Sequence, residues 1–367
     1  MRASEAPLRN KHASSASLAQ CSIARPPGGR LGVLVALTVA IAIMAGARSQ
    51  ALRVDMLRSI GGLPPYIAGG FSEAVGFQQG PDGTYYVFDR RAHAVFAVNE
   101  ARTAVRTLVD IGQEEGRLIQ PKGFDVAPDG RLVVADAPRN RHRIQVFDAA
   151  GVRQAGFYLP GQPAAQIVVD NLMLNGTGGV HWAGTRLLLS HPESGVLVTA
   201  YSPAGYPTLT FGRLRSTGFE SDRELHLAHN AGLPLADPAG GFYFVFLTGR
   251  PIFRKYDADG MLVFERHIEG AEIDALLDSQ PTVWPRRRVD DREVPFVAPV
   301  IRAAAVSPKG ELWISMAVPY TYVYDRQGDK TRTIQFYGAG LVGPTSLAFS
   351  RSGTVLVTPG CYEFPAS

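Results

Sequence analysis

The stretch from Gln120 to Gly151 reads QPKGFDVAPDGRLVVADAPRNRHRIQVFDAAG and decides the fold of this chain. Two short apolar runs, Gly123 to Val126 and Arg131 to Ala135, flank the turn Ala127-Pro128-Asp129-Gly130, in which proline presets φ and glycine accepts a positive φ. A third run, Arg143 to Phe147, alternates polar and apolar residues, and the turn after it leads into a fourth. We therefore expect four antiparallel strands joined by tight turns, which form one blade of a β-propeller.

The same pattern recurs along the chain at a spacing of roughly 40 to 50 residues, which is typical of a repeat architecture. The first turn of each copy ends in a glycine, and the six glycines are Gly83, Gly130, Gly184, Gly240, Gly310 and Gly353. A later turn recurs with Gly151, Gly205, Gly260 and Gly328. The sequence therefore predicts an all-β fold, a six-bladed β-propeller of four-stranded antiparallel blades, in preference to a sandwich or an open solenoid.

The sixth copy stops at Ser367, which leaves room for three strands and not four. The segment Leu52 to Gly61, LRVDMLRSIG, resembles the fourth strands of other blades, such as Leu262 to Arg266. We expect this N-terminal segment to pair with the last blade and close the ring, because closure removes two exposed sheet edges at once.

Three regions follow from the hydropathy and charge of the chain: a basic leader at 1–30, an apolar segment at 31–47, and a single propeller at 51–367. The apolar segment, LGVLVALTVAIAIMAGA, carries no charge and ends in the small-x-small pattern Ala45-Gly46-Ala47 of a cleaved signal peptide. If it is not cleaved, it would serve as an N-terminal membrane anchor. In both cases we expect the propeller to be exported, to the periplasm or the extracellular space, with membrane contact only through residues 31–47.

The charge of the chain argues against nucleic-acid binding. The formal net charge is +4, and the leader alone holds five basic residues and one acidic residue, so the rest of the chain has 32 of each sign. The basic pI therefore reflects the leader and not the propeller. Of the two cysteines, only Cys361 belongs to the propeller, where we expect it to be a buried apolar residue and not a nucleophile.

The connection at 267–300 is the longest departure from the repeat. Glu269 to Ser279 places Ile273, Leu276 and Leu277 at helical spacing, and prolines then end the helix. A charged run containing Arg286-Arg287-Arg288 follows. This insertion is interpreted either as a lid over the central channel or as a surface addition whose arginines pair with neighbouring acids.

Propellers bind at the mouth of the central channel, where the connections to the innermost strands converge, and a convergence of polar groups is expected of a pocket. Aligning the six copies places there Glu73, Gln120, Lys122, Asn175, His229, Asn230, Arg302 and Thr345. The ligand-binding candidates are Glu73, Lys122, His229, Asn230 and Arg302. The catalytic candidates are Glu73, His229 and Arg302. Glu73 could act as a metal ligand or general base, or could instead pair with Arg302 or Lys122 and plug the channel.

The other histidines and the tyrosine run favour structural roles. His226 and His229 would share a face only on a helix, and no zinc motif surrounds them. His181 and His191 are expected to bond backbone groups, and His93 and His142 occupy matching loop positions that indicate a repeat feature. Tyr320, Tyr322 and Tyr324 are predicted to be core residues and not a sugar-stacking platform.

Pro121-Lys122-Gly123, Pro128-Asp129-Gly130, Val134-Ala135-Asp136 and Arg143 to Phe147 with Gly151 resemble an NHL repeat, and the exported part is similar to six-bladed NHL-type propellers. That resemblance implies the fold and not an activity, since such propellers serve as binding scaffolds, lyases and hydrolases.

The chain also resembles gluconolactonase-like propellers, a resemblance that implies a divalent metal ion held by a Glu, an Asn and an Asp. Glu73 matches that Glu, Asn230 is displaced by one position from that Asn, and Arg302 stands in place of that Asp. A guanidinium cannot coordinate a cation.

The leading expectation from sequence is an exported binding or interaction module with a small polar ligand or a protein partner at the channel mouth. The alternative is a metal-assisted lactonase-like hydrolase that uses Glu73, His229 and Asn230 with a divalent metal ion as cofactor.

Overall fold

The chain divides into two units, Met1–Ala51 and Leu52–Ser367. The computed structural model describes residues 53–160, 166–169, 172–175, 179–289 and 292–366. The basic leader and the apolar segment predicted at 31–47 lie outside the described residues. Within the described residues, no helix combines the length and the apolar character needed to cross a membrane.

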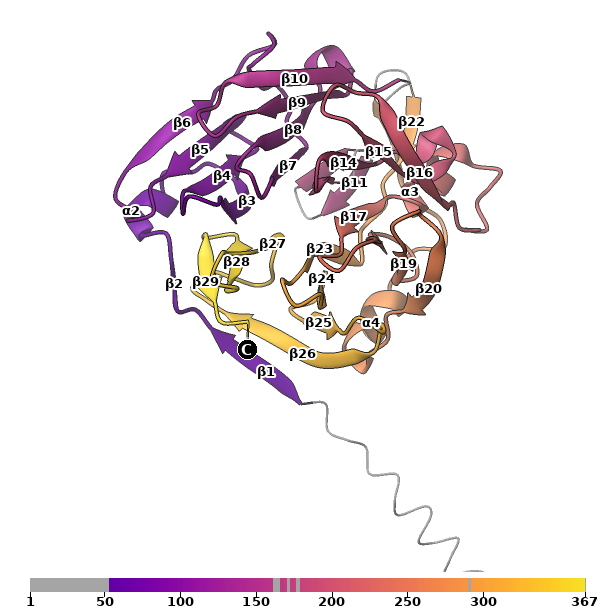
Figure 1. The fold of residues 1–367 in the computed structure, drawn as a ribbon. Helices are drawn as coiled ribbons and strands as arrows, with labels where there is room; N and C mark the ends of the chain where they lie inside the picture. The colour runs from indigo at the N-terminus through magenta and orange to yellow at the C-terminus, as the bar shows by residue number, and fades with distance from the viewer. Residues whose placement is uncertain (1–52, 161–165, 170–171, 176–178, 290–291, 367) are drawn as a thin grey trace, which may run out of the picture. The chain divides into compact units, whose positions relative to one another are not determined.

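Six sheets form a ring in the second unit (Figure 1). Apart from two N-terminal strands that join the last two blades, the strands of each sheet are antiparallel and follow their order in the chain. The first three blades are β3 (Ala74–Gln79), β4 (Tyr85–Asp89), β5 (Ala94–Val98) and β6 (Val105–Val109); β7 (Gly123–Val126), β8 (Leu132–Asp136), β9 (Arg143–Phe147) and β10 (Arg153–Tyr158); and β13 (Val180–Ala183), β14 (Arg186–Ser190), β15 (Val196–Tyr201) and β16 (Pro207–Arg213). The other three are β17 (Gly232–Ala236), β18 (Phe242–Phe246), β19 (Ile252–Tyr256) and β20 (Leu262–His267); β23 (Ile301–Val306), β24 (Leu312–Met316), β25 (Thr321–Tyr324) and β26 (Lys330–Tyr337); and β27 (Ser346–Phe349), β28 (Val355–Thr358) and β29 (Tyr362–Phe364), completed by β2 (Gly61–Gly62). The six-bladed prediction is confirmed.

The turns predicted from glycine have the backbone that they require. Gly130 and Gly151 both have a φ of 87°, a region that favours glycine. A Cβ atom on Gly151 would lie 2.5 Å from the carbonyl oxygen of Leu108 in the preceding blade. Glycine at this turn therefore allows blades one and two to approach closely.

The second strands of the blades are buried on both faces because each blade packs between its neighbours. All five residues of β4, β8, β18 and β24 are buried. The largest core cluster joins blades four and five and contains Tyr322 and Tyr324, so the core prediction is confirmed for these two tyrosines. Tyr320, which lies just before β25, is only partly buried and packs against the same cluster. Cys361 is also buried, and burial raises the pKa of its thiol to about 12, as expected for an inert residue.

Ring closure by the N-terminal segment is confirmed, but its pairing is divided between two blades. Only Gly61–Gly62 pairs with the last blade, opposite Glu363 and Tyr362 of β29. The longer part, β1 (Val54–Arg58), runs parallel to β26 and is the fifth strand of blade five. Glycine fits beside β29 because a Cβ atom on Gly62 would lie 2.3 Å from the carbonyl oxygen of Cys361. Leu57 of β1 packs into the core between blades five and six, which holds the strand in place.

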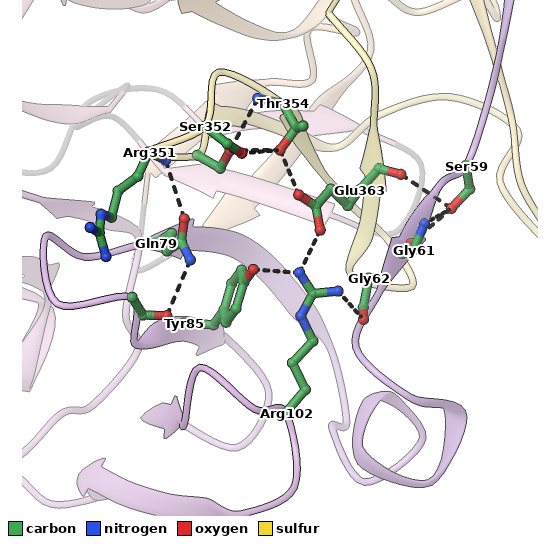
Figure 2. A network of polar contacts seen from close by, with 12 residues as sticks. Ser59, Gly61, Gly62, Gln79, Tyr85, Arg102, Arg351, Ser352, Thr354 and Glu363 are labelled. Atoms are coloured by element: carbon green, nitrogen blue, oxygen red, sulfur yellow. Dashed lines mark hydrogen bonds and ion pairs between the residues drawn. The ribbon is translucent and has the colours of Figure 1, made fainter.

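Arg102 clamps this seam from the turn between the last two strands of blade one (Figure 2). Its guanidinium donates hydrogen bonds to the carbonyl oxygen of Gly62 (3.0 Å), to the hydroxyl of Tyr85 and to Oε2 of Glu363 (2.5 Å). The side chains of Arg102 and Glu363 are 25% and 12% exposed. One side chain therefore joins blade one, the closing strand and blade six.

Four segments between the blades depart from the repeat, and each precedes the innermost strand of a blade. They are the short helix α2 (Pro65–Ala68), the hairpin of β11 (Gln166–Val169) and β12 (Leu172–Asn175), helix α3 (Arg223–His229), and the insertion with helix α4 (Ala271–Asp278) and the hairpin of β21 (Arg286–Val289) and β22 (Arg292–Pro295). Two short 3-10 helices, η1 (Pro138–Asn140) and η2 (Pro192–Ser194), form turns of blades two and three.

The helix predicted within 269–279 is present as α4, whereas the charged run after it forms a hairpin that the sequence did not predict. The hydroxyl of Tyr322 donates to Oε2 of Glu272 (2.9 Å) and ties α4 to blade five. The hairpin contacts α3 through an apolar cluster, which we call the rim cluster, of Leu225, Ala228, Trp284, Val294 and Val297. Neither α4 nor β22 is drawn over the centre of the ring in Figure 1. The insertion is thus bound to neighbouring elements of the ring, and a lid role for it stays a prediction.

Candidate functional site

One face of the ring holds every connection that leads into an innermost strand, together with the turns between the second and third strands. We call it the mouth face. Because strands alternate in direction within a blade, Lys122 directly before β7 and His142 directly before β9 both belong to this face. His191, directly after β14, belongs to it in the next blade.

Lys122 is partly buried at the start of blade two. Its backbone N–H donates to the carbonyl oxygen of Ala135 (2.7 Å), which fixes its position beside β8. Burial lowers the pKa of its ammonium group to about 8, and the nearby charge of Asp136 opposes this shift only in part. Within the described residues, the ammonium group has neither an ion pair nor a hydrogen bond.

Asp136 does not neutralise Lys122 because it is engaged by Arg143. The two side chains are 0% and 2% exposed, and Nη2 of Arg143 lies 2.5 Å from Oδ2 of Asp136. Arg143 also donates to the backbone carbonyl groups of Gln113, Glu114 and Arg117, so it fixes the connection between blades one and two. This buried pair is structural and leaves the charge on Lys122 uncompensated.

His142 is 4% exposed, and neither of its ring nitrogens has a hydrogen-bond partner among the described residues. Burial, together with the neighbouring Lys122 and His191, lowers its pKa to about 3. The ring is therefore neutral at physiological pH, with one N–H donor and one acceptor nitrogen. A buried polar group without a partner costs about 1–3 kcal/mol, so this arrangement needs an explanation beyond packing.

Two more buried polar atoms without described partners lie in the adjoining turn of blade three. His191 is 5% exposed and its Nδ1 is unpartnered, while its Nε2 lies 3.5 Å from Oε2 of Glu193. Burial lowers the pKa of His191. Ser190 is fully buried and its hydroxyl is also unpartnered among described residues. Lys122, His142, Ser190 and His191 together form what we call the mouth cluster.

Glu73 is not part of this cluster. Its carboxylate forms a bidentate pair with Arg90 of the same blade, at 2.6 Å from Nη2 and 3.0 Å from Nε. The predicted pairing with Lys122 or Arg302 across the channel is thus replaced by a pair within blade one. Arg90 stands where blade two has Ala137, at the first position after the second strand, so the partner is supplied locally.

His229 and Asn230 end helix α3, where they support the rim cluster. Asn230 is fully buried: its Oδ1 accepts from the backbone N–H of Arg215 (2.8 Å), and its amide donates to the carbonyl oxygens of Arg215 (3.3 Å) and His226 (3.0 Å). The His229 ring stacks on Phe219 and meets the edge of Trp284. Burial lowers the pKa of His229 to about 4. Asn230 is therefore fully engaged in holding α3, whereas His229 packs there with its Nε2 buried and without a hydrogen-bond partner among the described residues.

The remaining candidates are spread around the ring. Arg302 is partly buried on the innermost strand of blade five, and the hydroxyl of Thr345 lies 2.9 Å from that of Thr358. Gln120 is exposed, with a φ of 49°. Asn175 is on β12, before blade three begins, and its side chain is not among those that the structure describes.

The residues predicted as metal ligands do not fit a metal ion. The carboxylate of Glu73 is held by Arg90, the amide of Asn230 is held by backbone groups, and Arg302 is a cation. The described residues contain no group of three or more His, Cys, Asp or Glu that could hold a metal ion. We therefore derive no chemistry through a metal.

The mouth cluster shows what the sequence interpretation missed. The matching positions of His93 and His142 indicated a repeat feature, but burial distinguishes them, since His93 is only partly buried. The sequence signal was the presence of His142 and His191 on corresponding turns of neighbouring blades. The prediction for His181 was also wrong: its Nδ1 lies 3.0 Å from Oδ2 of Asp125, a side chain and not a backbone group.

Comparisons with known proteins give similarities to one repeat family and to several solved structures. Residues 118–147 match the NHL repeat and overlap most of the segment that decides the fold. Comparison with the curated proteins gives no match. Among solved structures, the chain is similar to a streptogramin B lyase (11% identity, TM-score 0.48, covering 80% of this chain and 93% of that chain). It is also similar to a gluconolactonase from Xanthomonas campestris (17%, 0.48, 80% and 86%) and to a virginiamycin B lyase from Staphylococcus aureus (10%, 0.47, 78% and 78%). These similarities concern the fold, and no residue role is transferred from them.

Proposed function

We propose that this protein is an exported binding propeller that takes a small polar ligand at the mouth cluster of blades two and three. The observation that carries the proposal is His142, whose two ring nitrogens are buried without a partner among the described residues. A ligand that offers one acceptor and one donor would satisfy both nitrogens and recover the energy that each loses in the free protein.

The depth of the cluster favours a small ligand over a protein partner. His142 and His191 are only 4% and 5% exposed, so a flat protein surface laid on the mouth face would not reach their ring nitrogens. Pockets for small molecules are typically concave and contain a few polar groups that fix the orientation of the ligand. Lys122 supplies the charged group of such a set.

The turn that precedes His142 has a strained backbone. Arg139 and Asn140 of η1 have φ values of 51° and 58°, two consecutive non-glycine residues in the left-handed region. Such a backbone costs about 1–3 kcal/mol per residue and tends to occur at functional sites. These two strained residues lie directly before Arg141 and His142, next to the proposed site.

A ligand panel tests the proposal. The melting temperature of the full-length protein is measured with hexoses, glycerol, malonate, malonamide and inorganic phosphate, in the wild type and in His142→Phe. We expect at least one compound to stabilise the wild type, by up to about 2.7 kcal/mol at a hundredfold excess over its Kd, and to leave His142→Phe unchanged.

His267→Phe is the matched control, because this histidine is exposed on β20 of blade four. The control should respond as the wild type does. Equal stabilisation of His142→Phe and the wild type by every active compound would contradict the proposed site, as would a panel with no active compound.

A further inference from the structure

Around the mouth cluster, most negative side chains have ion-pair or hydrogen-bond partners, whereas several positive side chains have no ion pair within the described residues. Each carboxylate that begins or ends a strand near Lys122 is already engaged. Glu73 is paired with Arg90 and Asp136 with Arg143. Asp89 accepts hydrogen bonds from the backbone N–H groups of Ser72, Glu73 and Ala92. These three carboxylates are therefore already engaged, and the remaining one beside the cluster, Glu193 of η2, lies against His191, with its Oε2 3.5 Å from Nε2 of that ring.

The positive groups nearby are not compensated in the same way. Within the described residues, Lys122 and the exposed Arg91 and Arg139 form no ion pair, and Arg141 only stacks on Tyr158 (4.4 Å from guanidinium carbon to ring centre). Arg91 belongs to the turn after β4, and Arg139 to the turn after β8. The connection into β7 also carries the exposed Glu114, which forms no ion pair within the described residues, but the cations without an ion pair outnumber it on the mouth face of blades one and two. This excess of positive charge attracts anions.

Hydrogen-bond chemistry points the same way. The buried rings of His142 and His191 are held neutral, so each carries one N–H group that can donate. An anionic oxygen beside them can accept from an imidazole N–H and from the Lys122 ammonium at once. Charge-assisted hydrogen bonds of this kind are roughly twice as strong as neutral ones.

Building on the proposed function, we propose that the ligand of the mouth cluster is a small anion, whose carboxylate or phosphate oxygen binds the ammonium group of Lys122 and an imidazole N–H of His142. A cation would be repelled by Lys122. A neutral ligand would leave the ammonium charge buried and without a counter-charge.

Binding should depend on pH through Lys122. The titratable groups near it are Asp136 from β8, which is held by Arg143, and the neutral ring of His142. His142 in turn lies near His191, which contacts Glu193 of η2. The pKa of Lys122 is about 8 in the free protein, so the anchor is charged below that pH and is lost above it. A bound anion raises this pKa, and affinity therefore falls as the pH rises above about 8.

Calorimetry on the full-length protein tests the inference with malonate, inorganic phosphate and the uncharged malonate analogue malonamide. We expect malonate or phosphate to bind, and malonamide to bind at least about tenfold more weakly. Lys122→Gln should weaken anion binding by a similar factor. Lys309→Gln, which changes an exposed lysine in a turn on the opposite face, should leave it unchanged. Comparing the affinities for malonate and for phosphate shows whether the site prefers a carboxylate or a phosphate.

Three results would overturn the inference: malonamide binding as tightly as malonate, Lys122→Gln binding anions as the wild type does, or neither anion binding. If a neutral panel compound stabilises the protein through His142 while neither anion binds, the anion class is wrong and the proposed binding site stands. If no panel compound acts through His142, the proposed function fails and this inference fails with it.

Discussion

Replacing Arg102 with alanine should open the seam where the ring closes (Figure 2). The change removes hydrogen bonds to Gly62, Tyr85 and Glu363, and also a stacking contact of the guanidinium with the Tyr85 ring (4.7 Å). Glu363, which is 12% exposed, would keep only its bond from the Thr354 hydroxyl (2.6 Å). Removing one partner of a buried ion pair typically costs about 3–5 kcal/mol.

We expect a loss of about 3–4 kcal/mol in the free energy of unfolding, since the pair is partly solvated and Glu363 keeps one hydrogen bond. Urea unfolding measures this loss as a lower midpoint at an unchanged slope. The single ammonium group of a lysine could not reach all three acceptors at once, so Arg102→Lys should recover less than half of the loss. Combining Arg102→Ala with Glu363→Gln should cost less than the sum of the two single changes.

The matched control is Arg117→Ala, because the ion pair of Arg117 with Asp110 is 3.8 Å long and both side chains are more than half exposed (52% and 61%). It should cost less than about 1 kcal/mol. If Arg102→Ala costs no more than Arg117→Ala, Arg102 does not hold the seam and the reasoning is refuted.

Two further predictions concern the closing segment and Lys122. Deleting residues 51–62 removes β1 and β2 together, which exposes the edges of β26 and β29, so the melting temperature should fall sharply; an unchanged value would show that the ring closes without them. Lys122→Met should stabilise the fold at pH 7 by about 1–3 kcal/mol, because it removes a buried charge without a counter-charge. The pKa of Lys122 is about 8 in the folded protein and 10.5 ordinarily, so the unfolded chain binds more protons between these values and wild-type stability rises with pH across that window. Urea unfolding should therefore show that the stability gained by Lys122→Met over the wild type is smaller at pH 10.5 than at pH 7. An equal gain at the two pH values would contradict a buried charge at Lys122.

The sequence predicted the fold well because a propeller blade is specified locally. Alternating residues and turn glycines such as Gly130 and Gly151 define each hairpin without reference to distant residues. Ring closure was predicted from the unpaired edge of the last blade. The division of the closing segment between two blades was not, because it depends on the close approach of Gly62 to Cys361, which lies at the other end of the propeller sequence.

The candidate site was harder to predict, because the type of a residue and its position in the sequence do not reveal whether its polar groups already have hydrogen-bond partners. Glu73 and Asn230 were correctly placed near connections to innermost strands, but their bonds to Arg90 and to the backbone of Arg215 depend on local loop geometry. Conversely, His142 and His191 matched the repeat and looked structural. Their importance follows from burial combined with missing partners, which only the packed structure shows.

The most direct test of a ligand site at the mouth cluster is nitrogen NMR of the His142 ring in histidine-labelled full-length protein, with and without malonate. The account predicts a neutral ring that does not titrate near pH 6.5, because its pKa is about 3, and ring nitrogen signals that shift when malonate binds. Titration near pH 6.5, or signals that no compound of the panel moves, would contradict it.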